Sequence, residues 1–326
     1  MKSDLKKFID DTIDYIKTNF DTNDEYEYEI ISQSRINDIT EAKIQVVEKN
    51  DRHYGMSVRA EAAYDEGASV EEFAEYMWKS MTQRKLQTNT KKDVDFIIQN
   101  IGDISKYRDR IFGMLVNTEF NKKYLRDFPY TQITDDLAVI YKISVNDELS
   151  MPIGNNMLKS MNITKDELHD ICMHNLGNAD IHLYDMCEII LITPMGQAIV
   201  NDIINSTNCD ETTAKQLALK HIRMMNSGSP IPSMYIVTTS TKMNGAIGIL
   251  RKDIMDEAMR LMNTNELLVI PSSVHEALVM PYDEHTEDID ETREVIKCVN
   301  HDNLSKDEWL SDHPYIYSSL GLVSCS

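Results

Sequence analysis

Residues 235–280 read YIVTTSTKMNGAIGILRKDIMDEAMRLMNTNELLVIPSSVHEALVM, and short apolar runs, turn signals and a helical pattern follow one another clearly there. Tyr235-Ile236-Val237 predicts a strand. Asn244-Gly245 is a strong signal for a two-residue hairpin turn, because both central residues of that turn need a positive φ. We therefore expect Ala246 to Leu250 to return as the partner strand, and Asp253 to Met262 to form a helix.

The pattern continues to the end of this stretch and beyond it. Leu267 to Ile270 and Ala277 to Met280 predict two more strands, and Glu287 to Val299 predicts a helix. The predicted order is β-β-α-β-β-α, which is typical of a compact α+β module with antiparallel hairpins.

The first half of the chain shows a similar succession of helices and strands. Lys2 to Phe20 has apolar residues at helical spacing, and tyrosines alternate with glutamates over Tyr26 to Ile30, as in a strand with one wet face. Ser69-Val70-Glu71-Glu72 is a capping box that predicts the start of a helix. Strands are expected at Ile111 to Val116 and at Leu137 to Val145.

A chain of 326 residues favours two domains, because a single core seldom grows to that size. The first strong break is Met151-Pro152-Ile153-Gly154. The sequence therefore predicts an N-terminal α+β module over residues 1–150 and a C-terminal α+β module over residues 151–326.

Three helices are expected between this break and residue 235. Thr164-Lys165-Asp166-Glu167 is a second capping box, which predicts a helix through His174. Met195 to Asn205 and Glu211 to Met225 carry helical patterns, and Ser227-Gly228-Ser229-Pro230 is expected to end the last of them.

Charge and cysteine content limit the function classes. The net charge is -21, and residues 276–326 hold 12 acidic against 3 basic residues, so direct binding to nucleic acid or to an anionic membrane is not expected. Five cysteines without metal-site spacing predict free thiols. Without a long apolar run or a signal-peptide pattern at the N-terminus, we expect a cytoplasmic protein.

One loop carries the residue types of an activated nucleophile. Pro271-Ser272-Ser273-Val274-His275-Glu276 follows a predicted strand, where functional loops are common. We single out Ser273, His275 and Glu276 as candidate nucleophile, base and helper carboxylate. The alternative is a turn whose hydroxyl groups satisfy backbone groups, because adjacent residues in an extended chain do not converge.

Two other clusters contain metal-ligand residue types: the nitrogen and sulfur set His169, Cys172, His174, His182 and Cys187, and the acidic set Asp283, Glu284, His285, Glu287 and Asp288. Neither has the spacing of a standard metal site. The acidic set also fits a helix N-terminus, where carboxylates are favoured. We predict no metal and no cofactor, and assign no role to Asp312-His313.

The second half resembles an uncharacterised bacterial family, a domain of unknown function, over about residues 150–320. The resemblance depends on a Tyr-Ile-Val-Thr strand end, the small-residue turn Asn244-Gly245-Ala246, and the segment Pro271-Ser272-Ser273-Val274-His275-Glu276. That family has no known activity, so the resemblance implies no catalytic residues.

These observations favour a non-catalytic protein that binds a protein partner. The alternative from another class is a hydrolase, using Ser273 with His275 and Glu276 or a metal. A third hypothesis is an acidic mimic of nucleic acid that blocks a basic enzyme, which predicts carboxylates in rows on one face.

Overall fold

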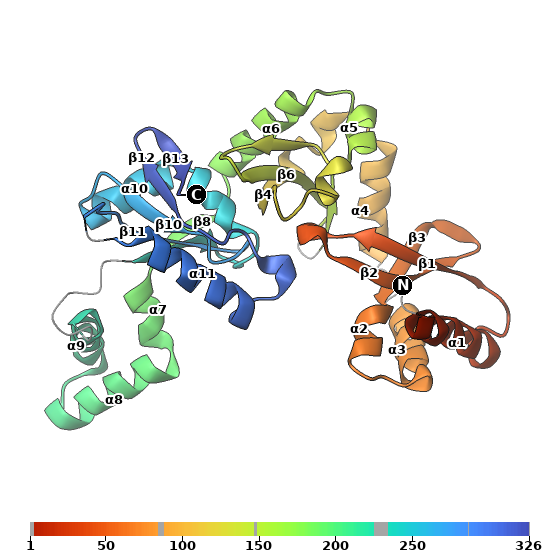
Figure 1. Cartoon of the computed structure of the whole chain (residues 1–326), viewed down its shortest axis with the longest axis horizontal. Helices are drawn as coiled ribbons and strands as arrows, with labels where there is room; N and C mark the ends of the chain where they lie inside the picture. Colours follow the sequence, from red (N-terminus) through yellow and green to blue (C-terminus); the bar gives the residue numbers. More distant parts are fainter. Residues whose placement is uncertain (1–2, 84–87, 147–148, 225–233, 286, 326) are drawn as a thin grey trace. The chain divides into compact units, whose positions relative to one another are not determined.

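The computed structural model describes residues 3–83, 88–146, 149–224, 234–285 and 287–325. The chain forms two compact units (Figure 1). Unit 1 comprises Met1–Ile101 and Val145–Leu149, and unit 2 comprises Gly102–Ser144 and Ser150–Ser326. Helices and antiparallel sheets occur in both, which confirms the α+β class.

These units divide the chain at a different place from the expected boundary near residue 150. The reason is strand pairing: β6 (Leu137–Ser144) pairs with both β4 (Ile111–Asn117) and β7 (Ser150–Pro152). Strands β4 and β6, which precede the predicted boundary, therefore belong to the same sheet as β7, which lies at the boundary.

Unit 1 is a three-stranded sheet with the first three α-helices of the chain on one face (Figure 1). Its elements are α1 (Ser3–Asn19), β1 (Tyr26–Ser34), η1 (Ile36–Asp38), β2 (Thr40–Glu48), β3 (Asp51–Arg59), α2 (Ala60–Asp65), α3 (Val70–Gln83) and α4 (Thr88–Gln99). Ile9 and Ile16 of α1, Ile44 of β2 and Met77 of α3 are fully buried in one core. The amphipathic spacing of the sequence forms this core, since each element contributes one apolar face.

Unit 2 contains two antiparallel sheets. One has the order β4-β6-β5, with β7 also paired to β6, and the other has the order β13-β12-β10-β11-β9-β8. The remaining strands are β5 (Tyr130–Gln132), β8 (Ile181–Asp185), β9 (Tyr235–Thr239), β10 (Leu267–Ile270), β11 (Ala277–Pro281), β12 (Tyr315–Ser318) and β13 (Gly321–Ser324).

The helices of unit 2 begin largely where their caps predict. They are α5 (Asn155–Met161), α6 (Lys165–Gly177), α7 (Met186–Ile192), α8 (Pro194–Thr207), α9 (Glu211–Met224), α10 (Lys252–Met262) and α11 (Ile289–Asn303), with short 3-10 helices η2 (Ile104–Lys106), η3 (Arg108–Arg110), η4 (Tyr124–Arg126), η5 (Gly245–Leu250) and η6 (Lys306–Glu308). Thr164 and Glu167 form the expected capping box of α6. The expected helix end at residues 227–230 lies outside the described residues.

The expected hairpin at Asn244-Gly245 is wrong. Asn244 has the positive φ (53°) that such a turn needs, but Gly245 does not, and residues 245–250 form the 3-10 helix η5. β9 is paired with β8 on one side and with β11 on the other, so neither edge is left for a returning strand. Pairing with distant strands has overridden the local turn signal.

The helices α7, α8 and α9 are inserted between the paired strands β8 and β9 and have a core of their own, formed by Cys187, Leu191, Val200, Ala214, Ala218 and Ile222. Among the described helices none is by itself long and apolar enough to cross a membrane. The consecutive helices α7 and α8 reach that length and apolarity only when joined, and they meet at a 76° bend.

Candidate functional site

The segment Pro271–Glu276 forms the loop between β10 and β11. Ser273 is buried, with 5% of its surface exposed. Its Oγ accepts a hydrogen bond from the backbone N–H of His275 at 3.0 Å, and its own N–H donates to the carbonyl of Glu276 at 3.1 Å. The serine hydroxyl therefore closes a tight local turn, as serine side chains often do.

His275 connects this turn to the start of η5. Its Nδ1 accepts from the backbone N–H of Asn244 at 3.1 Å. Its carbonyl accepts from the N–H of Gly245 at 2.9 Å and from Oγ1 of Thr238 at 2.8 Å. A Cβ on Gly245 would lie 2.5 Å from Oγ1 of Thr238, so only glycine allows this close approach.

This geometry does not bring the three candidate residues into a catalytic arrangement. In the described part of the chain, Ser273 Oγ makes one hydrogen bond, which it accepts from the backbone N–H of His275. No hydrogen bond there joins the serine hydroxyl to the imidazole ring. The Nε2 of His275 lies 3.8 Å from Oε1 of Glu308, whereas Glu276 contributes its carbonyl to the turn. A nucleophile needs a base within hydrogen-bond reach, so the catalytic assignment stays a prediction that these contacts do not support.

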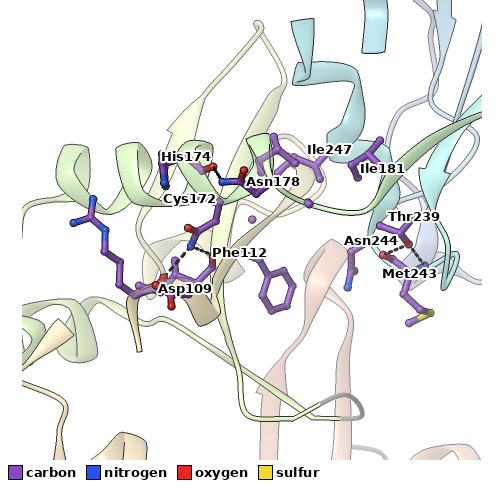
Figure 2. A pocket seen from close by; sticks show the side chains of 16 residues that line it. Asp109, Phe112, Cys172, His174, Asn178, Ile181, Thr239, Met243, Asn244 and Ile247 are labelled. Carbon is purple, nitrogen blue, oxygen red and sulfur yellow. Dashed lines mark hydrogen bonds between the residues drawn. The ribbon is translucent and has the colours of Figure 1, made fainter. Parts of the chain in front are cut away.

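Asn244, whose N–H donates to His275, is also part of the lining of a cavity of about 550 Å³ (Figure 2). Its apolar lining includes Phe112 of β4, Cys172 of α6, Ile181 of β8 and Ile247 of η5. Its polar lining includes Arg108, Asp109, His174, Asn178, Thr239 and Asn244. The volume falls within the range of about 300–1,000 Å³ that is typical of small-molecule sites.

Local bonds hold the cavity walls in place. Nδ2 of Asn175 donates to the carbonyls of Arg108 and Ile111, both at 2.8 Å, and so attaches the start of β4 to α6. A Cβ on Gly113 would lie 2.7 Å from Sγ of Cys172 and from Cδ1 of Ile247, so this glycine lets α6 and η5 approach β4 closely. Both contacts shape the inner wall of the cavity.

The thiol of Cys172 is not a candidate nucleophile. Burial raises its pKa to about 12, because a thiolate is poorly solvated in apolar surroundings. The side chain therefore contributes apolar surface to the cavity rather than charge.

A second polar cluster is assembled from residues far apart in the sequence. The carboxylate of Asp136, just before β6, accepts from Nδ2 of Asn117 at 2.7 Å, from Nε2 of His313 at 3.1 Å, and from the hydroxyl of Tyr315 at 2.9 Å. The Tyr315 hydroxyl is also 3.0 Å from Oγ of Ser311. We call these five residues the Asp136 network; it joins the two sheets of unit 2.

The charges of this network are held by its hydrogen bonds. Burial alone would raise the pKa of Asp136, but the bonds from His313 and Tyr315 outweigh it and lower the pKa. Burial likewise disfavours the charged form of His313, yet its bonds to Asp136 and to the carbonyl of Pro314 raise its pKa. Both partners are acceptors, so the site favours the imidazolium form of His313, in which both ring nitrogens carry protons.

This network contains a serine, a histidine and a carboxylate, but it lacks the geometry of an active site. His313 has no free nitrogen to act as a base, and Ser311 is fully buried. The cluster is a buried ion pair whose polar groups already have hydrogen-bond partners, so its role is structural. No role was predicted for Asp312-His313, because 177 positions separate His313 from Asp136 and no local pattern signals their contact.

The two clusters with metal-ligand residue types do not form a metal site in the part of the chain that the structure describes. Among the residues that the structure describes, no group of three His, Cys, Asp or Glu side chains could hold an ion. Nδ1 of His169 lies 3.1 Å from the Tyr141 hydroxyl, and His182 pairs with Asp180. Oδ1 of Asp288 accepts from the N–H groups of Asp290 and Glu291, so it caps α11 as expected for an acidic helix start.

The fold and these contacts define an α+β protein whose candidate site is a cavity of mixed lining in unit 2. The chain belongs to the Family of unknown function (DUF5688), whose model matches residues 5–319. The resemblance to a domain of unknown function is thus confirmed, and the match also covers the N-terminal half. No curated protein and no solved structure matches the chain.

Proposed function

We propose that this chain is a non-catalytic cytoplasmic protein that binds a protein partner through the elbow between α7 and α8. The observation that carries the proposal is the exposure of two large apolar side chains there. Ile192 is 74% exposed and Met195 is 53% exposed. Exposed apolar surface of this kind is typical of sites that bind another protein.

Local hydrogen bonds hold the elbow in place, which favours a binding role over a frayed helix end. Oγ1 of Thr193 donates to the carbonyl of Ile190 at 2.6 Å and accepts from the N–H of Gly196. Nε2 of Gln197 donates to the carbonyl of Leu191 at 2.8 Å. A surface that is ordered before binding loses less entropy on association.

The charge of the inserted helices supports a protein as the partner. Residues 186–224 hold 4 acidic and 3 basic residues, so they are nearly neutral within a chain of net charge -21. The partner we expect therefore presents an apolar pocket or groove, which Ile192 and Met195 would fill. Binding to nucleic acid or to an anionic membrane would instead need a basic surface.

The cysteines support the cytoplasmic location. All five are free thiols, and Cys172 and Cys187 are buried. Unpaired cysteines are typical of proteins from reducing compartments.

The two alternatives have weaker support. The hydrolase hypothesis needs an activated serine, whereas Oγ of Ser273 bonds to the backbone of its own turn. The nucleic-acid mimic needs unpaired carboxylates in rows, whereas several carboxylates of α9, α10 and α11 form ion pairs with lysines or arginines one turn away on the same helix.

The proposal is tested with Ile192→Glu and a matched control, Leu261→Glu. Leu261 lies on α10 and is 44% exposed, so both variants add one carboxylate to the surface. Each full-length protein is used to capture partners by cross-linking from a lysate of its host. The captured protein is then purified, and its affinity is measured by calorimetry.

We expect wild type and Leu261→Glu to bind the same purified partner, and Ile192→Glu to bind it at least about tenfold more weakly. Equal affinity of Ile192→Glu and wild type contradicts the elbow as the binding surface. Failure of wild type to capture any protein contradicts the interaction function itself.

A further inference from the structure

We propose that the cavity of unit 2 binds a small zwitterion with an apolar body, the chemistry of a hydrophobic amino acid or a short apolar peptide. Its lining is separate from the α7–α8 elbow, so this site goes beyond the proposed function. The argument depends on the two charges at its rim, the amide of Asn244 and the apolar part of its lining.

Arg108 and Asp109 place opposite charges at one end of the cavity. Both belong to η3, both line the cavity and both side chains are exposed. Within the described ranges neither forms an ion pair, with each other or with another residue. Arginine binds carboxylates through its planar fork of N–H donors, and a carboxylate such as Asp109 binds an ammonium group.

A ligand with only one charge would leave one of these two groups without a partner. The chain as a whole has 21 more acidic than basic residues, so an arginine without an ion pair at a cavity rim stands out against that background. A zwitterion satisfies both side chains at once, which is why it fits better than a simple anion or a simple cation.

Asn244 provides neutral hydrogen-bonding groups away from this charged end. In the view of Figure 2, Phe112 lies between Asp109 and Asn244. The backbone of Asn244 is fixed by its bond to Nδ1 of His275, while in the described part of the chain its carboxamide makes no hydrogen bond. That carboxamide can both donate and accept, so it suits a peptide group of the ligand.

The cavity also has apolar lining. Phe112, Ile181 and Ile247 line it, together with the thiol of Cys172, which burial keeps protonated. Apolar walls with a few placed polar groups are the usual composition of a small-molecule site. This part of the cavity would take the aliphatic or aromatic side chain of the ligand.

The test is calorimetric titration of the full chain with four probes. L-phenylalanine and the dipeptide leucyl-phenylalanine carry both charges, 3-phenylpropanoate lacks the ammonium group, and 2-phenylethylamine lacks the carboxylate. We expect at least one zwitterion to bind saturably, and each single-charge probe to bind at least about tenfold more weakly. The proposal is overturned if neither zwitterion binds at millimolar concentration, or if a single-charge probe binds as well as the zwitterions.

Two variants test which charge of the ligand Arg108 and Asp109 each bind. Arg108→Gln should weaken the zwitterion about tenfold and leave 2-phenylethylamine unchanged, whereas Asp109→Asn should weaken the zwitterion and leave 3-phenylpropanoate unchanged. The control is Arg126→Gln, since Arg126 is also exposed on a 3-10 helix but lies outside the cavity lining. An equal effect of Arg108→Gln and Arg126→Gln would show a general charge effect and overturn the proposal.

A third variant tests the location independently of charge. Ala179 lines the cavity and is exposed, so Ala179→Trp should occupy the cavity without disturbing the core. We expect it to abolish binding of the zwitterion while the far-ultraviolet circular dichroism spectrum stays unchanged. Unchanged binding by the folded variant would place the ligand elsewhere.

Discussion

The loop Pro271–Glu276 and the Asp136 network contain the same chemical groups, a serine, a histidine and a carboxylate, but the two regions use them differently. In the loop these groups are neighbours in the sequence, and they bond mainly to backbone atoms of nearby turns. In the network Ser311 and His313 are also close in the sequence and form the same kind of turn, but the carboxylate belongs to Asp136, 177 positions away, and it accepts from the His313 ring.

The comparison shows that adjacency in the sequence is a poor guide to convergence in space. Side chains of consecutive residues in an extended segment point to opposite sides, so a serine, a histidine and a glutamate in one loop rarely meet. The ring and the carboxylate that meet lie just before two different strands, His313 before β12 and Asp136 before β6. In this protein even the converged set is saturated with hydrogen bonds, so it stabilises the fold rather than presenting a free base.

The largest expected effect is a loss of stability when the Asp136 network is broken. Asp136→Asn removes the charge that His313 and Tyr315 face, and leaves a buried imidazolium without a counter-ion. We expect the free energy of unfolding to fall by about 3–5 kcal/mol, measured by urea denaturation. The exposed neighbour provides the control, since Asp135→Asn should change the stability by less than about 0.5 kcal/mol. A similar loss in both variants would contradict the assigned role.

A smaller effect is expected from pH. Because the pKa of His313 is raised above its usual 6.5, its contribution is fully present below pH 6.5 and is lost as the pH rises through the raised value. We expect this to cost about 1–2 kcal/mol, the difference between charged and neutral hydrogen bonds. Urea denaturation of wild type and His313→Gln at about pH 6 and about pH 9 measures it.

The variant should lose less stability than wild type over this interval, because it no longer has the titrating ring. An identical loss in both proteins would mean that other groups cause the pH dependence. At acid pH the direction is opposite. Because the pKa of Asp136 is lowered below 3.8, the stability that its carboxylate contributes is lost only as the pH falls through that lowered value.

The smallest expected effect concerns the loop. His275→Ala removes the acceptor of the Asn244 N–H, and we expect a loss of about 1 kcal/mol in the free energy of unfolding. His301→Ala is the control, since His301 lies on the exposed surface of α11 and should show no measurable change. If His275→Ala leaves stability unchanged and abolishes a hydrolytic activity, the comparison fails and the hydrolase alternative is restored.

Much of the fold could be predicted from local patterns in the sequence. The capping boxes at Ser69 and Thr164 and the alternating strand at Tyr26 to Ile30 lie where they were expected, because caps and amphipathic periodicity act within a few residues. The strand pattern at Ala246 to Leu250 was misleading, because β8 and β11 occupy both edges of β9.

The sequence alone therefore determined the α+β class, most helix starts and the membership of a family without known activity. Tertiary structure was needed for the pairing of β9, for the cavity lined by β4, α6, β8 and η5, and for the ion pair of Asp136 with His313. These features depend on contacts between residues many positions apart, and such contacts are made by packing and strand pairing rather than by local propensity.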